Sequence, residues 1–178
     1  LIEYQPSPSL LDGLIKYEKK KINIENYSLN KIWDNPNLKE TEQQNLNSFF
    51  WLFSLDLKSS KKDTQNVLYQ WIIKNDRYNS KNWKVDIIGK RIIAWISNSR
   101  LTYEDGSIDY KGKFNGIIKK QINHLINEIE TSELINDKII GCAAIILTGL
   151  SYPQNNNYLN AGLSLLKKLA KYSLDNDG

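Results

Sequence analysis

Cysteine is almost absent from this sequence, and its scarcity excludes several kinds of site. The single cysteine, Cys142, lies inside an apolar run, so this chain can form no disulfide framework, CxxC redox motif or cysteine-based zinc site. Long apolar runs are lacking as well, because the longest, 139–150, is too short to cross a bilayer. The sequence therefore predicts neither a metal site nor a membrane span.

The short motifs that identify common enzymes are also missing. No GxSxG, HExxH or GxGxxG occurs, and Asp105-Gly106 is a turn signal only. The isolated acids Asp56, Asp86 and Asp137 follow no pattern of paired carboxylates. From the residues alone we predict no catalytic residue and no cofactor.

The composition that remains is that of a soluble, folded domain. Hydrophobic residues make up 40% and charged residues 25% of 178 positions, which allows one substantial core and excludes a disordered tail. The net charge of +4 favours anionic partners, and both nucleic acid and a polyanionic sugar fit it. The lysines are scattered, so charge alone does not choose between these two.

The chain divides near residue 40. Residues 1–40 contain three of the four prolines and no helical periodicity, which predicts an irregular lead-in with at most a short strand pairing. Residues 41–178 are expected to form an incomplete helical domain of a larger protein, because the chain starts with Leu1 and stops just after a helical pattern. Six helices are predicted, at 42–58, 63–76, 85–100, 113–130, 137–151 and 156–174.

These six segments alternate in character. The first, third and fifth are apolar on nearly every side, as buried helices are, whereas the second, fourth and sixth carry one apolar stripe. With short polar links between them, this alternation predicts an all-α fold of three αα-hairpins in two layers, the odd-numbered helices inside. The spacing of the inner helices suits an α-solenoid or a partial (α/α) toroid, of which three hairpins would be half.

One end of such an array gathers the links that lead into the inner helices. Trp83, Asp86, Asn136 and Asp137 all fall at this end. Helix N-termini favour anions, and an exposed tryptophan suits the face of a sugar ring, so these residues form a candidate binding site. The alternative is structural: Trp83 packs on the start of its helix, and the polar residues cap the helix starts or place acids in their first turns.

Two residues of the predicted third helix are further candidates for substrate binding. Arg91 lies on the border of the apolar face, and a buried guanidinium needs a partner. That partner is either a substrate carboxylate or a structural acid such as Asp56. Trp95 lies one turn further along the same helix.

The aromatic pattern also predicts burial. We expect Trp51, Trp71 and Trp95 to be mostly buried and Trp83 to be the most exposed of the four. His124 points away from the apolar stripe of its helix, which predicts a surface residue rather than a catalytic base.

Several aromatic segments follow one another in a characteristic order. They are Phe50-Trp51-Leu52, then Leu68-Tyr69-Gln70-Trp71-Ile72, then Trp83 followed by Arg91-Ile92-Ile93-Ala94-Trp95-Ile96. In this order they resemble the N-terminal toroid segment of heparinase II/III-like proteins, with further similarity at 121–125, 149–150 and 177–178. The resemblance covers 49–178.

This resemblance implies a function. The family joins an (α/α) toroid to β-sheet domains and comprises lyases that cleave uronic-acid polysaccharides, such as glycosaminoglycans, by β-elimination. In these enzymes an Asn neutralises the uronate carboxylate, which makes the C5 proton acidic. Tyr or His then removes that proton and protonates the leaving oxygen. In the family that Asn lies just past the position of 177–178 and the Tyr and His lie further on, so no catalytic residue is expected here.

The implied partners are an anionic polysaccharide, with no nucleic acid, and the rest of the toroid and the β-sheet domains of the same protein. A periplasmic or secreted location would follow from the family. The residues expected to contribute to substrate binding are Trp83, Arg91, Trp95, Asn136 and Asp137.

The sequence departs from the family at two points. Val85-Asp86 follow Trp83 where some members have Pro-Tyr, and Asn136-Asp137 stand where others have Asn-His. Two other functions therefore stay open. One is a non-enzymatic α-solenoid that binds a protein or polyanion, and the other is a glycoside hydrolase toroid, which would need two carboxylates across a cleft.

Overall fold

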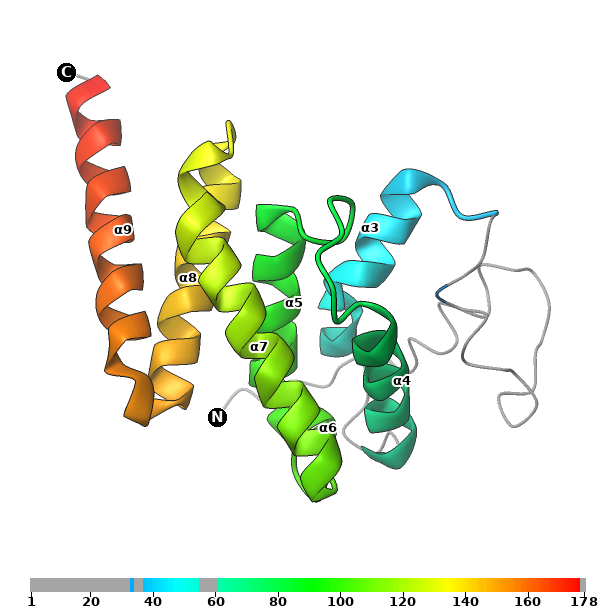
Figure 1. The fold of residues 1–178 in the computed structure, drawn as a ribbon. Helices are drawn as coiled ribbons and strands as arrows, with labels where there is room; N and C mark the ends of the chain where they lie inside the picture. The colour runs from blue at the N-terminus through cyan, green and yellow to red at the C-terminus, as the bar shows by residue number, and fades with distance from the viewer. Residues whose placement is uncertain (1–32, 34–36, 55–60, 177–178) are drawn as a thin grey trace.

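The computed structural model describes residue 33 and residues 37–54 and 61–176, and in this part every regular element is helical (Figure 1). Because no strand occurs among these residues, the predicted all-α class is confirmed for them. The predicted lead-in and its strand pairing lie almost wholly outside the described residues. The elements are α3 (Glu40–Ser48), η2 (Phe50–Ser54), α4 (Lys61–Lys74), α5 (Val85–Ser97), α6 (Ser99–Thr102), α7 (Ile108–Glu128), η3 (Ile129–Thr131), α8 (Ile135–Ser151), η4 (Pro153–Asn155) and α9 (Asn156–Asn176).

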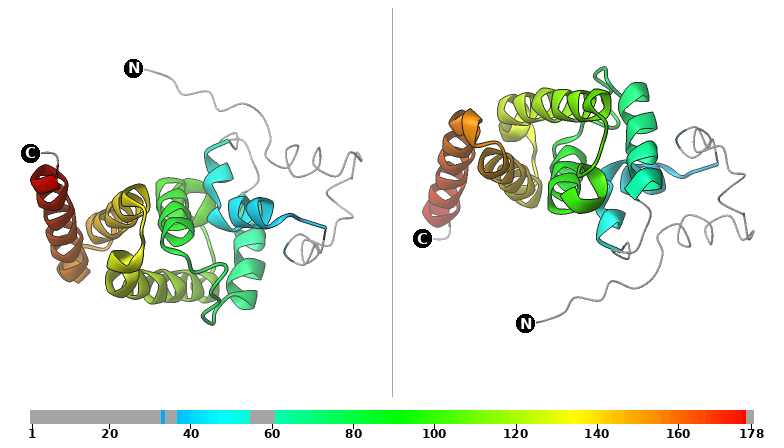
Figure 2. Two further views of the ribbon diagram at one scale, coloured as in Figure 1. Left: turned by 90° about the horizontal axis from the view of Figure 1, so that it is seen from above. Right: turned by 90° about the horizontal axis from the view of Figure 1, so that it is seen from below.

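The helices from α3 to α8 form two layers, as the alternation of apolar patterns predicted, whereas α9, the sixth predicted helix, does not lie in the outer layer with α4 and α7. Viewed along the helices, α3, α5 and α8 lie in one row and α4 and α7 in a second, while α9 packs along α8 at the end of the row (Figure 2). The three inner helices run in the same direction, and α7 runs antiparallel to α5 and α8 (Figure 1). Solenoids and toroids share this arrangement, so the toroid remains a prediction.

α5 is the central helix of the inner row. Its sequence is apolar on nearly every side, and α3, α7 and α8 all pack against it. Most of this helix is buried, as predicted, and its eight buried residues are Val85, Ile87, Ile88, Gly89, Arg91, Ile92, Ala94 and Trp95. Burial on every side was too strong a prediction, because Asp86, Lys90 and Ile93 are half-buried along one side and Ser97 is exposed.

The first predicted helix, 42–58, is wrong from residue 49 to residue 54, and its last four positions lie outside the described residues. α3 ends at Ser48, because Phe49 takes a left-handed backbone conformation with φ of 54° and a 3-10 helix follows. Such a φ costs a non-glycine residue about 1 kcal/mol or more. The ring of Phe49 is fully buried, and this offsets the cost. Its ring centroid lies between 5.2 and 5.6 Å from those of Trp33, Trp51, Trp71 and Trp95.

α8 was predicted to be buried on every side, and this is also wrong. One face packs between α5 and α9, but Ile139 is 45% exposed and Leu150 is 63% exposed on the other face. No described helix covers that face. Because α8 is apolar on nearly every side, its sequence could not show which face would be exposed. Even with this face, no helix in the described part of the chain is long and apolar enough to span a membrane.

Arg91 is a buried cation at the centre of this structure. Its Nε donates to the carbonyl of Asn47 at 2.8 Å and its Nη2 to the carbonyl of Asn82 at 2.6 Å, while its Cζ lies 4.1 Å from the ring centroid of Trp71. Burial lowers the pKa of Arg91 to about 9, so the guanidinium keeps its charge at neutral pH. This geometry fits the structural alternative, with backbone carbonyls as partners; the predicted partner Asp56 lies outside the described residues.

Close contact between α8 and α9 depends on Gly149. A Cβ on Gly149 would lie 2.4 Å from the backbone nitrogen of Leu159 and 2.7 Å from its Cα. Because backbone atoms cannot move aside as a flexible side chain can, only glycine fits here. The α8–α9 hairpin can therefore close only around a residue without a side chain.

We predict that Gly149→Ala lowers the free energy of unfolding by about 1–3 kcal/mol, because overpacking against backbone forces the two helices apart. Gly116→Ala is the matched control. A Cβ on Gly116, in α7, would meet no other atom within 4 Å, so the same change should stabilise the protein by about 0.5–1 kcal/mol. Urea denaturation followed by circular dichroism measures both. Equal effects of the two substitutions would contradict the close contact.

We also predict that Arg91→Ala lowers the free energy of unfolding by about 3–5 kcal/mol, because two buried carbonyls lose a charged donor and a cavity remains. Arg100 is exposed in α6, so Arg100→Ala should change the same quantity by no more than about 0.5 kcal/mol. Thermal and urea unfolding of both variants give the comparison. If Arg91→Ala were as stable as Arg100→Ala, Arg91 would have no structural role.

Candidate functional site

Two pockets lie against α5, α7 and α8, one at each end of these helices. The helix-start pocket, beside the first turns of α5 and α8, has a volume of about 600 Å³. The helix-end pocket, beside their last turns, has a volume of about 570 Å³. α7 contributes residues to both. Among the residues that the structure describes, no group of three His, Cys, Asp or Glu side chains could hold a metal ion.

The helix-start pocket lies where the sequence predicted a binding site. Trp83, Asp86 and Asp137 all line it, so three of the four residues assigned to this end come together. Asn136 does not line it and is exposed in the first turn of α8. The common direction of the inner helices explains this gathering, because their first turns share one end of the array.

Trp83 was predicted to be the most exposed of four tryptophans, and this is wrong. It is only 7% exposed, whereas Trp51 is half-buried; Trp71 and Trp95 are fully buried, as predicted. The rings of Tyr78 and His124 cover Trp83, with centroids 5.9 and 5.3 Å away.

His124 was predicted to be a surface residue and is half-buried instead. Its Nε2 lies 3.1 Å from the carbonyl oxygen of Trp83, and since that oxygen can only accept, the nitrogen is the donor. His124 thus holds the link before α5 against α7. With Tyr78 on its other side, it leaves little of the Trp83 ring for a sugar to stack on.

The charges of the helix-start pocket do not suit an anion. Of its described lining residues, Asp86, Glu128 and Asp137 are acidic and Lys84 is basic. Lys90 holds Asp86 at 3.0 Å, and the hydroxyl of Ser132 lies 3.4 Å from Asp137. Asp86 and Asp137 lie in the first turns of α5 and α8, where a carboxylate is stabilised by the helix dipole. Their structural role as first-turn acids accounts for their positions.

The remaining predicted substrate-binding residues lie elsewhere. Arg91 lines neither pocket, because its guanidinium is buried under the link that carries Asn82. Trp95 lines the helix-end pocket, at the opposite end of α5 from Trp83. The five predicted residues therefore do not form one site.

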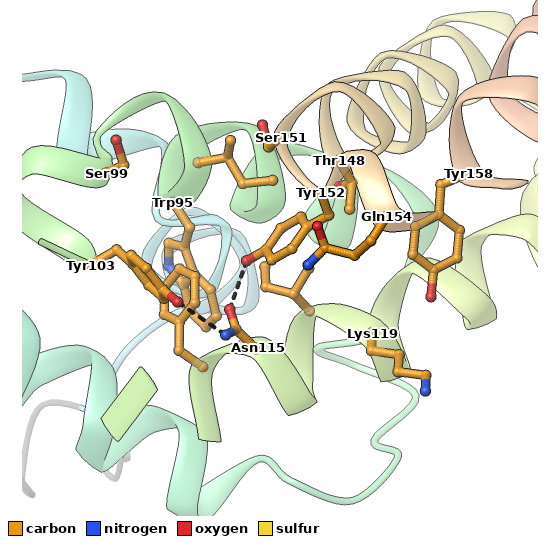
Figure 3. Close-up of a pocket in the computed structure, with 13 residues that line it drawn as sticks. Trp95, Ser99, Tyr103, Asn115, Lys119, Thr148, Ser151, Tyr152, Gln154 and Tyr158 are labelled. Atoms are coloured by element: carbon orange, nitrogen blue, oxygen red, sulfur yellow. Dashed lines mark hydrogen bonds between the residues drawn. The ribbon is translucent and has the colours of Figure 1, made fainter. Parts of the chain in front are cut away.

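The helix-end pocket is polar and aromatic. The rings of Tyr103, Tyr152, Tyr158, Trp95 and Phe114 form much of its wall. Hydroxyl and amide groups complete it, and of the described residues that line it Lys119 alone carries a charge. Figure 3 shows these side chains converging from α5, the end of α6, α7, the α8–α9 connection and the start of α9.

A chain of hydrogen bonds crosses this pocket. The Tyr152 hydroxyl donates to Asn115 Oδ1 at 2.8 Å, and Asn115 Nδ2 donates to the Tyr103 hydroxyl oxygen at 3.0 Å (Figure 3). Burial and the neighbouring Tyr103 raise the pKa of Tyr152 to about 12, so its phenol stays protonated at neutral pH. Two phenols and an amide are thereby held in fixed positions on one wall.

Sequence reasoning missed this pocket, although one signal was available. Asn115 and Lys119 are four residues apart on α7, so they lie on one face, directly beside the apolar stripe of Phe114 and Ile118. Tyr152 directly follows the end of α8 and belongs to no sequence motif that would mark a binding residue. Only the fold brings Tyr103 and Tyr152, 49 positions apart in the numbering, to the same amide.

Comparison with known proteins adds no relative. No family model, no curated protein and no solved structure matches this chain. The resemblance to heparinase II/III-like proteins therefore stays a prediction from the aromatic segments between 49 and 178.

Proposed function

We propose that this chain is the N-terminal toroid segment of a heparinase II/III-like polysaccharide lyase. In that protein it would supply scaffold and part of the cleft for a uronic-acid polymer, such as a glycosaminoglycan. The polymer would be cleaved by β-elimination, in which the C5 proton is removed and the leaving oxygen is protonated. No residue of this chain is assigned to that proton transfer.

The observation that carries the proposal is the lining of the helix-end pocket. Aromatic rings offer flat apolar faces to a sugar, while fixed phenol and amide groups offer donors and acceptors to its hydroxyls. A volume of about 570 Å³ falls within the range of sites for small ligands, roughly 300–1,000 Å³. One or two sugar rings of a longer polymer would fit such a site.

Charge favours an acidic sugar in the helix-end pocket over the helix-start pocket. The described lining of the helix-end pocket has Lys119 and no carboxylate, and the whole chain carries a net charge of +4. The helix-start pocket has three carboxylates and one lysine. An anionic polymer is repelled by the three acids of the helix-start pocket and attracted by the lysine of the helix-end pocket. We therefore assign the sugar to the helix-end pocket and leave Trp83 and Asp137 with structural roles.

One observation favours the second candidate function, a non-enzymatic helical binding module. The outward face of α8 exposes Ile135, Ile139 and Leu150. Exposed apolar side chains in a row are a common feature of surfaces that contact another protein. In a toroid the same face would pack against further helices, so this face agrees with both the lyase and the binding module. The lining of the helix-end pocket favours the function that involves a saccharide.

We predict that the chain binds an unsulfated tetrasaccharide of alternating glucuronic acid and N-acetylglucosamine, and that Asn115→Leu weakens this binding about tenfold. Leucine keeps the size of the side chain but removes both contacts that orient the phenols, a loss of about 1–2 kcal/mol. Isothermal titration calorimetry measures the affinity, with circular dichroism to check the fold.

Asp137→Asn is the control for the other pocket. It removes one charge from the helix-start pocket without changing its shape, so the affinity should stay within about twofold. A tenfold change with Asp137→Asn and none with Asn115→Leu would return the sugar to the helix-start pocket. No binding of the tetrasaccharide by the unmodified chain would contradict the saccharide function.

We further predict that this chain alone forms no elimination product. β-Elimination leaves an unsaturated uronate that absorbs in the ultraviolet, and the residues that the family resemblance implies for the proton transfer have no match here. Ultraviolet absorbance of purified chain mixed with uronic-acid polymers should stay flat over hours. Rising absorbance would show that this chain holds a complete catalytic site.

A further inference from the structure

The hydrogen-bonded chain in the helix-end pocket leaves one phenol hydrogen unused. Tyr152 gives its hydroxyl hydrogen to Asn115 Oδ1, and the Tyr103 oxygen accepts from Asn115 Nδ2. Tyr103 still carries its own hydroxyl hydrogen, for which no acceptor lies within hydrogen-bonding distance among the described residues. The Tyr103 hydroxyl can therefore donate a hydrogen bond to a ligand.

This result does not depend on which way the amide of Asn115 is turned. Rotating the amide by half a turn would let Tyr103 donate to the amide oxygen and make Tyr152 accept from the amide nitrogen. The hydroxyl hydrogen of Tyr152 would then be the free one. Because an amide offers one acceptor and one donor side, it can use the hydrogen of only one of two flanking phenols. In either case a free phenol hydrogen remains on a residue that lines the pocket.

We propose that the helix-end pocket recognises an anionic oxygen of its saccharide, a carboxylate or a sulfate ester, through this free phenol hydrogen and Lys119. The proposal rests on the proposed function, since it takes the ligand to be a saccharide. It adds the group of the sugar that is recognised and the residues that recognise it. Asn115 is then a positioning residue, because it fixes which phenol hydrogen is free without needing to touch the ligand.

The surroundings favour an anionic acceptor over a neutral one. Lys119 follows Asn115 by one turn of α7 and lines the same pocket, and no acidic residue lies among the described lining residues. A hydroxyl-to-anion hydrogen bond is about twice as strong as one between neutral groups. Burial raises the pKa of Tyr152 to about 12, so at neutral pH its phenol is a hydrogen-bond donor rather than a negative charge.

Asn115→Asp tests this arrangement with almost no change of shape. A carboxylate has two acceptor oxygens and no donor, so both phenols would donate to it and no phenol hydrogen would be left for a ligand. The new negative charge would also oppose an anion. Tyr103→Phe combined with Tyr152→Phe removes the phenol donors without adding charge, and this double variant separates the two effects.

The experiment measures calorimetric affinities of the 178-residue chain for three probes. The first is the unsulfated glucuronic-acid tetrasaccharide, the second is the same tetrasaccharide with its carboxylates reduced to hydroxymethyl groups, and the third is a neutral tetrasaccharide that carries one sulfate ester. We expect at least one acidic probe to bind about tenfold or more tightly than the reduced probe. Which acidic probe binds more tightly identifies carboxylate or sulfate as the recognised group.

The preference for an acidic probe should disappear in Asn115→Asp and fall about tenfold in the double phenylalanine variant, while binding of the reduced probe changes less. Lys119→Gln should lower the preference about twofold to fivefold. Lys120→Gln removes the same charge from the next residue of α7, which does not line the pocket, and should leave the preference unchanged.

The outcomes separate the inference from the proposed function. Equal binding of acidic and reduced probes by the unmodified chain would overturn the recognition of an anionic oxygen and leave the saccharide function standing. An acidic preference that survives in Asn115→Asp would overturn the role of the free phenol hydrogen. Failure of all three probes to bind would overturn both.

Discussion

The guanidinium of Arg91 has lost its water and holds two backbone carbonyls that belong to different parts of the chain. Asn47 lies at the end of α3 and Asn82 in the link into α5, while the ring of Trp71 from α4 covers the cation. Burying a charge is costly unless hydrogen bonds compensate it, and the bonds from Nε and Nη2 do this although Nη1 has no partner among the described residues. The positions of α3, α4 and the link are therefore constrained together. The aromatic cluster around Phe49 then fills the space that this constraint leaves.

With its start fixed in this way, α5 carries the two pockets at its two ends. The helix dipoles of α5 and α8 favour acids at their starts, and Asp86 and Asp137 occupy those places. Lys119 lines the pocket at the other end. The antiparallel α7 contributes His124 and Glu128 to one pocket and Asn115 and Lys119 to the other. Helix direction thus accounts for two of the three acids in the helix-start pocket, Asp86 and Asp137.

The sequence predicted the all-α class, the two layers and the burial of most of α5 from apolar periodicity, and it predicted the gathering of Trp83 with Asp137 from the common direction of the inner helices. It could not predict features that depend on contacts between distant residues. The break at Phe49 comes from aromatic neighbours, and the cover over Trp83 comes from Tyr78 and His124. The helix-end pocket was missed for the same reason, since Tyr103 and Tyr152 meet only through Asn115.

The close contact at Gly149 has a consequence for how the helix-end pocket could change in evolution. Thr148, the residue before Gly149, and Tyr158, the residue before Leu159, both line that pocket, so the glycine contact sets how near its far wall lies. A larger side chain at position 149 would move α9 outward and carry Tyr158 with it. The width of the pocket can therefore be altered by a residue that does not line it. The size of any molecule that the pocket can admit is in this sense limited by the contact between two helices.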